Sequence, residues 1–145
     1  MNKIIWLTGH SKSGKTTLAH VIKTATDCII LDGDEMRDSI SLGLGFSRKE
    51  RKEHNLKVAR LAKTLAKQTN VVVSVIAPMI DVRREITEIC DPVWIYVKRD
   101  IPEREGHFYE EPVICHYEID NNQDFEQSLK DIRKIAIEVF NKADK

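Results

Sequence analysis

The sequence predicts an α/β protein: a three-layer, doubly wound fold with helices on both faces of a mainly parallel, five-stranded sheet. Two observations carry this prediction. Short apolar runs alternate along the chain with longer segments of helical periodicity, which is typical of parallel sheets. In addition, the first apolar run, at residues 4–7, leads directly into GHSKSGKT at residues 9–16, which matches the G-x-x-x-x-G-K-[ST] phosphate-binding loop. The length of 145 residues fits one domain with one core.

The first four strands and the helices between them follow from local patterns. We expect strands at residues 3–8, 27–31, 71–76 and 93–97, each an apolar run of the length of a buried parallel strand. The run at 71–76 is β-branched and interrupted only by Ser74, and Pro78 ends it. Helices are expected at residues 16–26, 35–41, 48–66 and 81–90. Ser47 is the expected N-cap of the third helix, with Glu50 completing a capping box.

The C-terminal part completes the alternation with one strand and one helix. Residues 113–119 have the composition of a fifth strand. Apolar residues then recur at helical spacing and predict a last helix with one buried face: Phe125, Leu129, Ile132, Ala136 and Val139. Trp6 and Trp94 fall on strands, so we expect them in the core. No linker or repeat interrupts residues 1–145, which we interpret as a single domain.

Composition excludes several classes of function. The 23 Lys and Arg residues balance the 23 Asp and Glu residues, so no net charge draws the chain to nucleic acid or acidic membranes. Three cysteines, Cys28, Cys90 and Cys115, lie far apart and form no C-x-x-C pair. They are therefore interpreted as reduced cysteines, not as a zinc site or disulfide framework. The four-residue apolar run near the N-terminus is too short for a signal peptide, and we expect a cytoplasmic protein.

The phosphate-binding loop predicts a site for ATP. Its glycines let the backbone turn so that several N–H groups face phosphate oxygens, Lys15 reaches the β- and γ-phosphates, and the Thr16 hydroxyl ligates Mg²⁺. A polar turn between strand and helix is the alternative. Most side chains of such a loop point away from the phosphates, so His10 is expected to have a structural role. The predicted ATP-binding residues are Gly9, His10, Ser11, Lys12, Ser13, Gly14, Lys15, Thr16 and Thr17.

Further site residues are expected where the other strands end, because ligands bind beyond the carboxyl ends of parallel strands. The second strand ends in Asp32-Gly33-Asp34 and the third in residues 76–78. An Asp-Gly pair also marks hairpin turns, but the helical pattern that follows favours a loop between strand and helix. Carboxylates here would orient Mg²⁺ or accept a proton from an attacking hydroxyl group. Arg37, three residues after Asp34, lies on the same helix face and would bind an anionic substrate.

Four segments together resemble the adenylylsulfate kinases: GHSKSGKTT, LDGDEMR, LGFSRKERKEHN and IAP, in this order. The resemblance covers about residues 3–90. It implies transfer of the γ-phosphate of ATP to the ribose 3′-hydroxyl of adenosine 5′-phosphosulfate. It also implies that Asp34 lies next to the accepting hydroxyl and that Asp32 supports it or the Mg²⁺ water shell. The other substrate-binding residues implied are Arg37 and Arg51 for the 5′ anion, Phe46 stacked on the base, and Ile76 and Ala77 at its edge. Asn55 and Phe108 complete this predicted substrate set.

The chain also departs from the family pattern. Asn-Val of the double-aspartate motif is Glu35-Met36 here. Of the family's Glu-Asn pair, the Asn is replaced by His54, with Asn55 one place later. The serine before Pro78 is Ala77. The lysine-rich lid is shortened to about residues 98–112, which include Arg104, His107 and a second candidate stacking ring, Phe108. The segment at 109–112 resembles the family's PYE-x-P.

These departures leave alternatives open for the acceptor. A related branch of such kinases phosphorylates cytidine diphosphoramidate in capsular polysaccharide biosynthesis. A gluconate- or shikimate-type kinase, or an ATP-binding regulatory protein, would share the loop. The family often forms dimers, and a homodimer is an expectation that no surface feature of the sequence tests.

Overall fold

The computed structural model describes residues 3–10, 12–100 and 108–143. Its centre is a five-stranded sheet in the order β2-β3-β1-β4-β5, and all four neighbouring pairs are parallel. The strands are β1 (Ile4–Thr8), β2 (Cys28–Asp32), β3 (Asn70–Ser74), β4 (Val93–Lys98) and β5 (Tyr117–Asp120). The predicted α/β fold with a parallel sheet is therefore confirmed.

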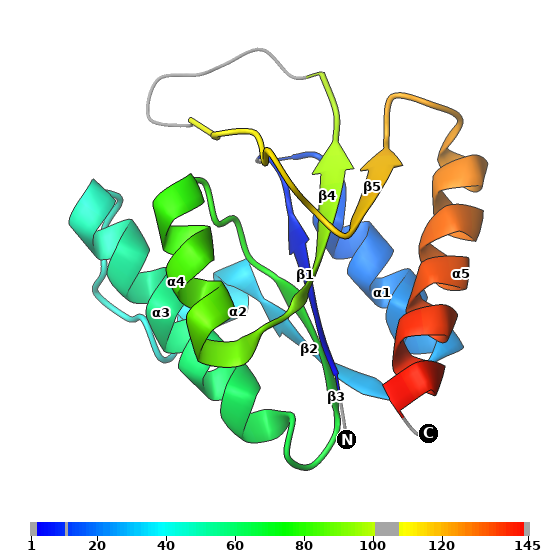
Figure 1. Ribbon diagram of the computed structural model, residues 1–145. Helices are drawn as coiled ribbons and strands as arrows, with labels where there is room; N and C mark the ends of the chain where they lie inside the picture. Colours follow the sequence, from blue (N-terminus) through cyan, green and yellow to red (C-terminus); the bar gives the residue numbers. More distant parts are fainter. Residues whose placement is uncertain (1–2, 11, 101–107, 144–145) are drawn as a thin grey trace.

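Helices cover both faces of the sheet and make the three layers seen in Figure 1. The helices are α1 (Lys15–Ala25), α2 (Gly33–Arg37), α3 (Arg48–Leu65), α4 (Ile80–Cys90) and α5 (Phe125–Ala143). α1 and α5 pack together on one face, and α3 and α4 pack together on the other. Each face has its own apolar cluster, because strand residues that alternate in direction are buried on both sides. None of the described helices is long and apolar enough to cross a membrane.

The two tryptophans lie in the core, as predicted. Trp6 is fully buried and Trp94 nearly so, and their ring centroids are 5.3 Å apart. Each indole N–H is satisfied: that of Trp6 donates to the carbonyl oxygen of Val75 at 3.0 Å, and that of Trp94 to the hydroxyl of Thr87 at 2.9 Å. A buried indole that lacked such an acceptor would destabilise the fold.

Three predicted boundaries are wrong. Residues 113–119 do not form one strand: β5 begins at Tyr117, and Val113 and Ile114 are 87% and 88% exposed. β3 ends at Ser74, because the next two carbonyl oxygens, of Val75 and Ile76, accept side-chain hydrogen bonds. The helix predicted at residues 35–41 is α2, which begins at Gly33 and ends at Arg37.

The last helix forms as predicted, with one difference in its buried face. Ile132, Ala136 and Val139 are buried, whereas Phe125, expected on the same face, is 45% exposed. Phe140 is buried instead. Phe125 is the first residue of α5.

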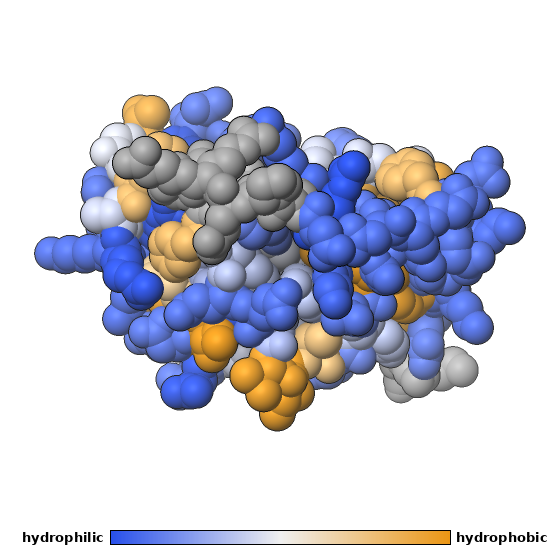
Figure 2. Space-filling model, turned by 90° about the horizontal axis from the view of Figure 1, so that it is seen from above, coloured by the Kyte–Doolittle hydropathy of each residue, from blue (hydrophilic) through white to orange (hydrophobic). Residues whose placement is uncertain are grey.

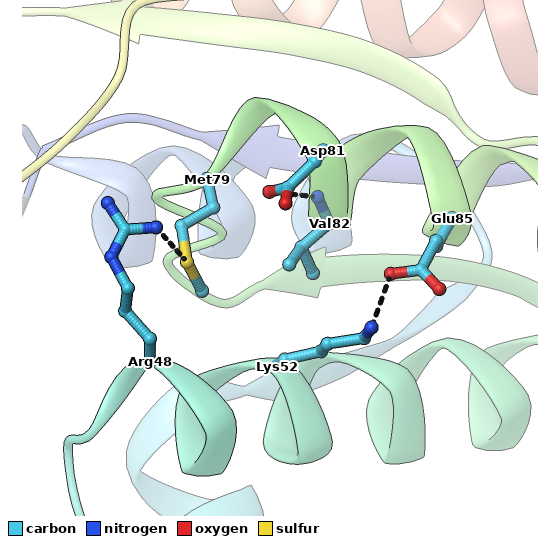
Figure 3. A network of polar contacts seen from close by, with 6 residues as sticks. All are labelled: Arg48, Lys52, Met79, Asp81, Val82 and Glu85. Atoms are coloured by element: carbon cyan, nitrogen blue, oxygen red, sulfur yellow. Dashed lines mark hydrogen bonds and ion pairs between the residues drawn. The ribbon is translucent and has the colours of Figure 1, made fainter.

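Buried apolar residues of α3 and α4 belong to one core cluster, and Figure 3 shows polar contacts beside them. The Lys52 ammonium lies 3.2 Å from the Glu85 carboxylate, and Arg48 donates to the sulfur of Met79 at 3.3 Å. Lys52 and Glu85 are 49% and 42% exposed, so their ion pair contributes about 0–1 kcal/mol. Buried residues such as Val58 and Ile86 therefore hold the two helices together.

Truncation of α5 tests the packing of this helix. Ile132→Ala removes a fully buried side chain, and we expect it to lower the free energy of unfolding by about 2–4 kcal/mol. Ile137→Ala, on the same helix, is the matched control because Ile137 is 38% exposed, and we expect a loss below about 1 kcal/mol. Urea unfolding curves measure both. Equal losses would contradict the described orientation of α5.

Candidate functional site

A cavity of about 520 Å³ lies beyond the carboxyl ends of β1, β2 and β3. Figure 2 shows the molecule from above, and hydrophilic residues dominate this face. Segments that follow three strands contribute to one surface, as expected for an open parallel sheet. The cavity is lined by Lys12, Gly14, Lys15, Thr16, Thr17, Asp32, Gly33, Asp34, Arg37, Phe46, Arg51, His54, Asn55, Ser74, Val75, Ile76 and Pro78.

The loop between β1 and α1 needs its two glycines for different reasons. A Cβ atom at Gly9 would overlap the carbonyl oxygen of Val97 on β4, so only glycine allows this close approach. Gly14 has a φ of 106°, in the left-handed region, and is the N-cap of α1. The side chain of Asn121, after β5, donates to the carbonyl oxygen of Ser13 at 2.6 Å. The N-terminus of α1 thus opens into the cavity, where its N–H groups favour an anion.

Lys15 is folded back onto this loop. Its ammonium group donates to the carbonyl oxygens of Gly9 and His10 at 3.0 and 2.7 Å, and to the hydroxyl of Ser13 at 3.2 Å. Lys15 is only 7% exposed, and burial lowers its pKa to about 8. Within the described residues, these three oxygens compensate the buried charge and no carboxylate contacts it. An anionic ligand in the cavity would offer the ammonium group a stronger partner.

The two aspartates after β2 have different surroundings. Asp32 is the N-cap of α2, and its Oδ2 accepts from the N–H groups of Asp34 and Glu35 at 3.1 and 3.3 Å. The segment predicted as a loop is therefore the end of a strand, a cap and the first turn of a helix. Asp34 is exposed on this turn and lines the cavity, where its carboxylate is accessible to a ligand.

Ser74 lies beside Asp32, its register partner across β2 and β3. It is 5% exposed, and its hydroxyl has no hydrogen-bond partner in the described structure. Thr16, Asp32 and Ser74 thus bring two hydroxyls and a carboxylate to the cavity. Oxygen donors of this kind suit Mg²⁺, which takes one or two carboxylates and binds phosphates with its remaining positions.

On the side of the cavity opposite the phosphate-binding loop, arginine guanidinium groups lie against phenylalanine rings. Phe46 is 67% exposed, with the Arg37 guanidinium 4.2 Å and the Arg51 guanidinium 5.7 Å from its ring centre. Arg51 also lies 5.1 Å from the ring centre of Phe108, and so does Arg48. Arg37 donates to the carbonyl oxygens of Leu44 and Gly45 at 3.2 and 3.1 Å, which fixes its position. Planar cations and flat rings would favour a ligand with an anion next to an aromatic group.

The start of α3 is stabilised as predicted, with one difference. The Ser47 hydroxyl accepts from the N–H of Glu50 at 3.1 Å, which confirms the N-cap. The Glu50 carboxylate accepts from the Ser47 hydroxyl at 2.9 Å and extends to the N–H of Gly45 at 2.6 Å. These hydrogen bonds lower the pKa of Glu50. Glu50 therefore also orders the turn that presents Phe46.

Two polar residues of α3 are buried where the helix faces the cavity. Asn55 is 1% exposed: its amide nitrogen donates to the carbonyl oxygen of Ile76 at 3.1 Å, and its amide oxygen has no described partner. His54 is 3% exposed, and its Nδ1 lies 2.7 Å from the Ser41 hydroxyl. Burial and the nearby Arg37 lower the pKa of His54 to about 4, so its ring is neutral at neutral pH.

The predicted site residues divide into three groups. Those that line the cavity are Lys12, Gly14, Lys15, Thr16, Thr17, Asp32, Asp34, Arg37, Phe46, Arg51, Asn55 and Ile76. Gly9, His10, Ser13, Ala77 and Phe108 lie around it without lining it. Ser11, Arg104 and His107 lie outside the described residues. The ring nitrogens of His10 are buried without a described partner, and its ring centre lies 6.3 Å from that of Tyr109.

Ser74 and His54 line the cavity but were not predicted as site residues, although both stand out in the sequence. Ser74 is the single polar residue in the apolar run at 71–76, and His54 departs from the family motif at a position of α3 that is buried. Asn121 and Arg83 carried no local signal, because their partners are backbone carbonyl groups, which no residue pattern marks: that of Ser13 for Asn121, and those of Ala77 and Glu110 for Arg83.

Comparison with known proteins gives a consistent result. The family described as Adenylylsulphate kinase matches residues 1–107. The adenylyl-sulfate kinase of Myxococcus xanthus (strain DK1622) is 35% identical over 97 residues, which cover 63% of this chain and 52% of that protein. The adenylyl-sulfate kinase of Bacillus velezensis (strain DSM 23117 / BGSC 10A6 / LMG 26770 / FZB42) is 30% identical over 145 residues, covering 96% and 67%. The chain thus spans about half the length of several curated relatives that it matches.

A solved structure extends the comparison to the fold. The Mycobacterium tuberculosis APS kinase in complex with AMPPNP and APS superimposes with a TM-score of 0.78 at 22% identity. This alignment covers 94% of this chain and 98% of that one. The similarity in fold therefore continues beyond residue 107, where the sequence match to the family ends.

The buried His54 predicts a specific pH dependence of stability. Its pKa is about 4 in the folded protein and 6.5 ordinarily, so the unfolded chain takes up the proton more readily. The neutral, buried His54 ring therefore leaves the free energy of unfolding at its full value above about pH 6.5. This free energy decreases as the pH falls toward 4. Between about pH 7 and about pH 5, we expect the free energy of unfolding to decrease less in His54→Gln than in the wild type, as measured by urea unfolding. His20→Gln, at an exposed position of α1, should behave as the wild type. An unchanged pH dependence in His54→Gln would contradict this assignment.

Proposed function

Because this chain belongs to the adenylylsulphate kinase family, we propose that it transfers the γ-phosphate of ATP to the ribose 3′-hydroxyl of adenylyl sulfate. One observation carries the proposal. The phosphate-binding loop and the group formed by Asp34, Arg37, Phe46 and Arg51 line the same cavity. A donor nucleotide on the loop would therefore face an acceptor held at the aromatic side.

The donor side would hold ATP through the loop N–H groups and Lys15. Lys15 would exchange its contacts with the loop carbonyls for the β- and γ-phosphates, and the anion would offset the effect of burial on its pKa. Thr16 and Asp32, with the Ser74 hydroxyl nearby, would hold Mg²⁺. The metal ion would neutralise charge on the phosphates during transfer.

The acceptor side would place the ribose next to Asp34. The 3′-hydroxyl oxygen would form a bond to the γ-phosphorus while the bond from that phosphorus to the β,γ-bridging oxygen breaks, and the Asp34 carboxylate would accept the hydroxyl proton. Arg37 and Arg51 would bind the 5′ anion, and Phe46 would stack on the base. Most of the rate enhancement would come from this positioning and from charge stabilisation.

The matched relatives are named adenylyl-sulfate kinases, which supports adenylyl sulfate over cytidine diphosphoramidate, a sugar acid or a purely regulatory role. Three expectations from the sequence stay predictions: a single kinase domain with a shortened lid at 98–112, a cytoplasmic location, and a homodimer.

Acceptor assays test the proposed substrate. We expect ADP release that depends on adenylyl sulfate, with a higher kcat/KM than for cytidine diphosphoramidate, gluconate or shikimate, measured in a coupled assay. Robust activity on a sugar acid and none on either nucleotide would overturn the proposal.

Two substitutions test the catalytic roles. Lys15→Ala should abolish transfer, because the phosphate charge then lacks its cation. Asp34→Asn should lower kcat by about 100-fold or more with little change in ATP affinity, because the proton acceptor is lost while the loop is intact. Glu35→Gln is the matched control, since Glu35 is an adjacent exposed carboxylate that does not line the cavity. Near-normal turnover in Asp34→Asn would remove its assigned role.

A further inference from the structure

The backbone at residues 76–78 forms one wall of the cavity, and donors from α3, from α4 and from the segment before β5 bind its consecutive carbonyl groups. Asn55 of α3 donates to the oxygen of Ile76 at 3.1 Å. Arg83 of α4 donates to the oxygen of Ala77. The N–H of Glu110 donates to the oxygen of Pro78 at 2.8 Å. This wall is irregular backbone, so its shape depends on these three donors and not on strand pairing.

Arg83 binds both the wall and the segment that contains Glu110. Its Nη1 binds Ala77, and its Nη2 donates to the carbonyl oxygen of Glu110. The Tyr109 ring lies over the guanidinium, with its centre 5.0 Å away. Arg83 is only 7% exposed, and burial lowers its pKa. No carboxylate in the described part of the chain forms an ion pair with it, so its fixed fork of donors serves two carbonyl groups.

Residues 108–112, which we call the anchor segment, continue from Arg83 to the donor side of the cavity. The Glu110 carboxylate accepts from the N–H of Ile80 at 2.9 Å and so caps α4, whose own N-cap residue, Met79, provides no side-chain bond. The Tyr109 hydroxyl lies 2.8 Å from that of Thr8, the residue before the phosphate-binding loop. The anchor segment therefore connects the cavity wall with the end of β1.

We propose that Arg83 is a positioning residue for acceptor binding: it fixes the wall at residues 76–78 and holds the anchor segment against it. This inference deepens the proposed function, because the wall would border the acceptor base. Arg83 does not line the cavity, so it acts through the backbone that it holds. Loss of its two donors would leave the buried carbonyl group of Ala77 and the partly buried one of Glu110 without this partner and free the wall to shift. A shift of about 1 Å at such a site costs up to about 100-fold in rate.

Three variants test this role. Arg83→Met keeps the aliphatic bulk and removes both donors, Arg83→Lys keeps the charge and loses the fork, and Arg84→Met is the control at an exposed neighbouring position on α4. In Arg83→Met we expect the KM for adenylyl sulfate to rise about tenfold or more while the KM for ATP changes less than about twofold. Arg83→Lys should fall between Arg83→Met and the wild type, and Arg84→Met should match the wild type.

Hydrogen exchange provides a readout that does not depend on activity. In Arg83→Met, exchange at the amides of Ile80 and Glu110 should accelerate about tenfold or more, while the amides of β1 and β4 keep their protection. Equal acceleration in the central strands, or an equal rise of both KM values, would show a purely structural role and overturn the proposal. Unchanged exchange at Ile80 and Glu110 would also overturn it. If the wild type uses no nucleotide acceptor, the proposed function fails, and the exchange result still decides whether Arg83 positions the wall.

Discussion

The site depends on one constraint: the backbone after β1 must turn at once into α1 and leave the first N–H groups of that helix facing the cavity. Gly9 allows the backbone to pass close to the carbonyl group of Val97. Gly14 adopts the left-handed conformation that the N-cap of α1 requires. Asn121 then holds the loop from outside through the Ser13 carbonyl group. The positive end of α1 and the buried Lys15 ammonium concentrate positive charge where a phosphate would bind. The central place of β1 in the sheet puts this charge between the segments that follow β3 and β4.

The opposite side of the cavity is built differently, because cations there lie on aromatic rings. Arg37 is fixed by two carbonyl groups at the turn before Phe46, and Glu50 orders the same turn through the Gly45 N–H. The exposed ring of Phe46 is thus held in place by polar contacts instead of by burial in the core. A surface of this kind can bind a flat, anionic ligand without refolding, which lowers the entropic cost of binding.

The sequence was sufficient for the features that depend on local patterns. The structure contains the predicted alternation of strands and helices, the glycine loop after β1 and the Ser47 cap of α3. The order of the strands in the sheet was not predicted. The failures share one feature: each depends on tertiary contacts, made or missing, that local patterns do not encode. Val113 and Ile114 are β-branched, but among the described residues no strand pairs with them, and both are exposed. β3 stops at Ser74 because Trp6 and Asn55 take the next carbonyl groups. His54 and Asn55 were notable in the sequence as departures from a motif, yet their burial depends on how α3 meets the cavity.

The part of the chain after residue 107 shows how a fold persists where a sequence match ends. The family match stops at residue 107, yet the alignment of folds covers nearly the whole chain. Three contacts from residues after 107 explain how: Glu110 caps α4, Asn121 holds the loop, and the ring of His116 accepts from the N–H of Trp94. In each, one partner is a backbone group, whose chemistry is the same whatever residue bears it. A contact of this kind constrains only the residue that provides the side chain, so the residues around it can change while the backbone keeps its course. The cavity wall at residues 76–78 is held in a related way, with the side chains of Asn55 and Arg83 and the backbone N–H of Glu110 each donating to a carbonyl group.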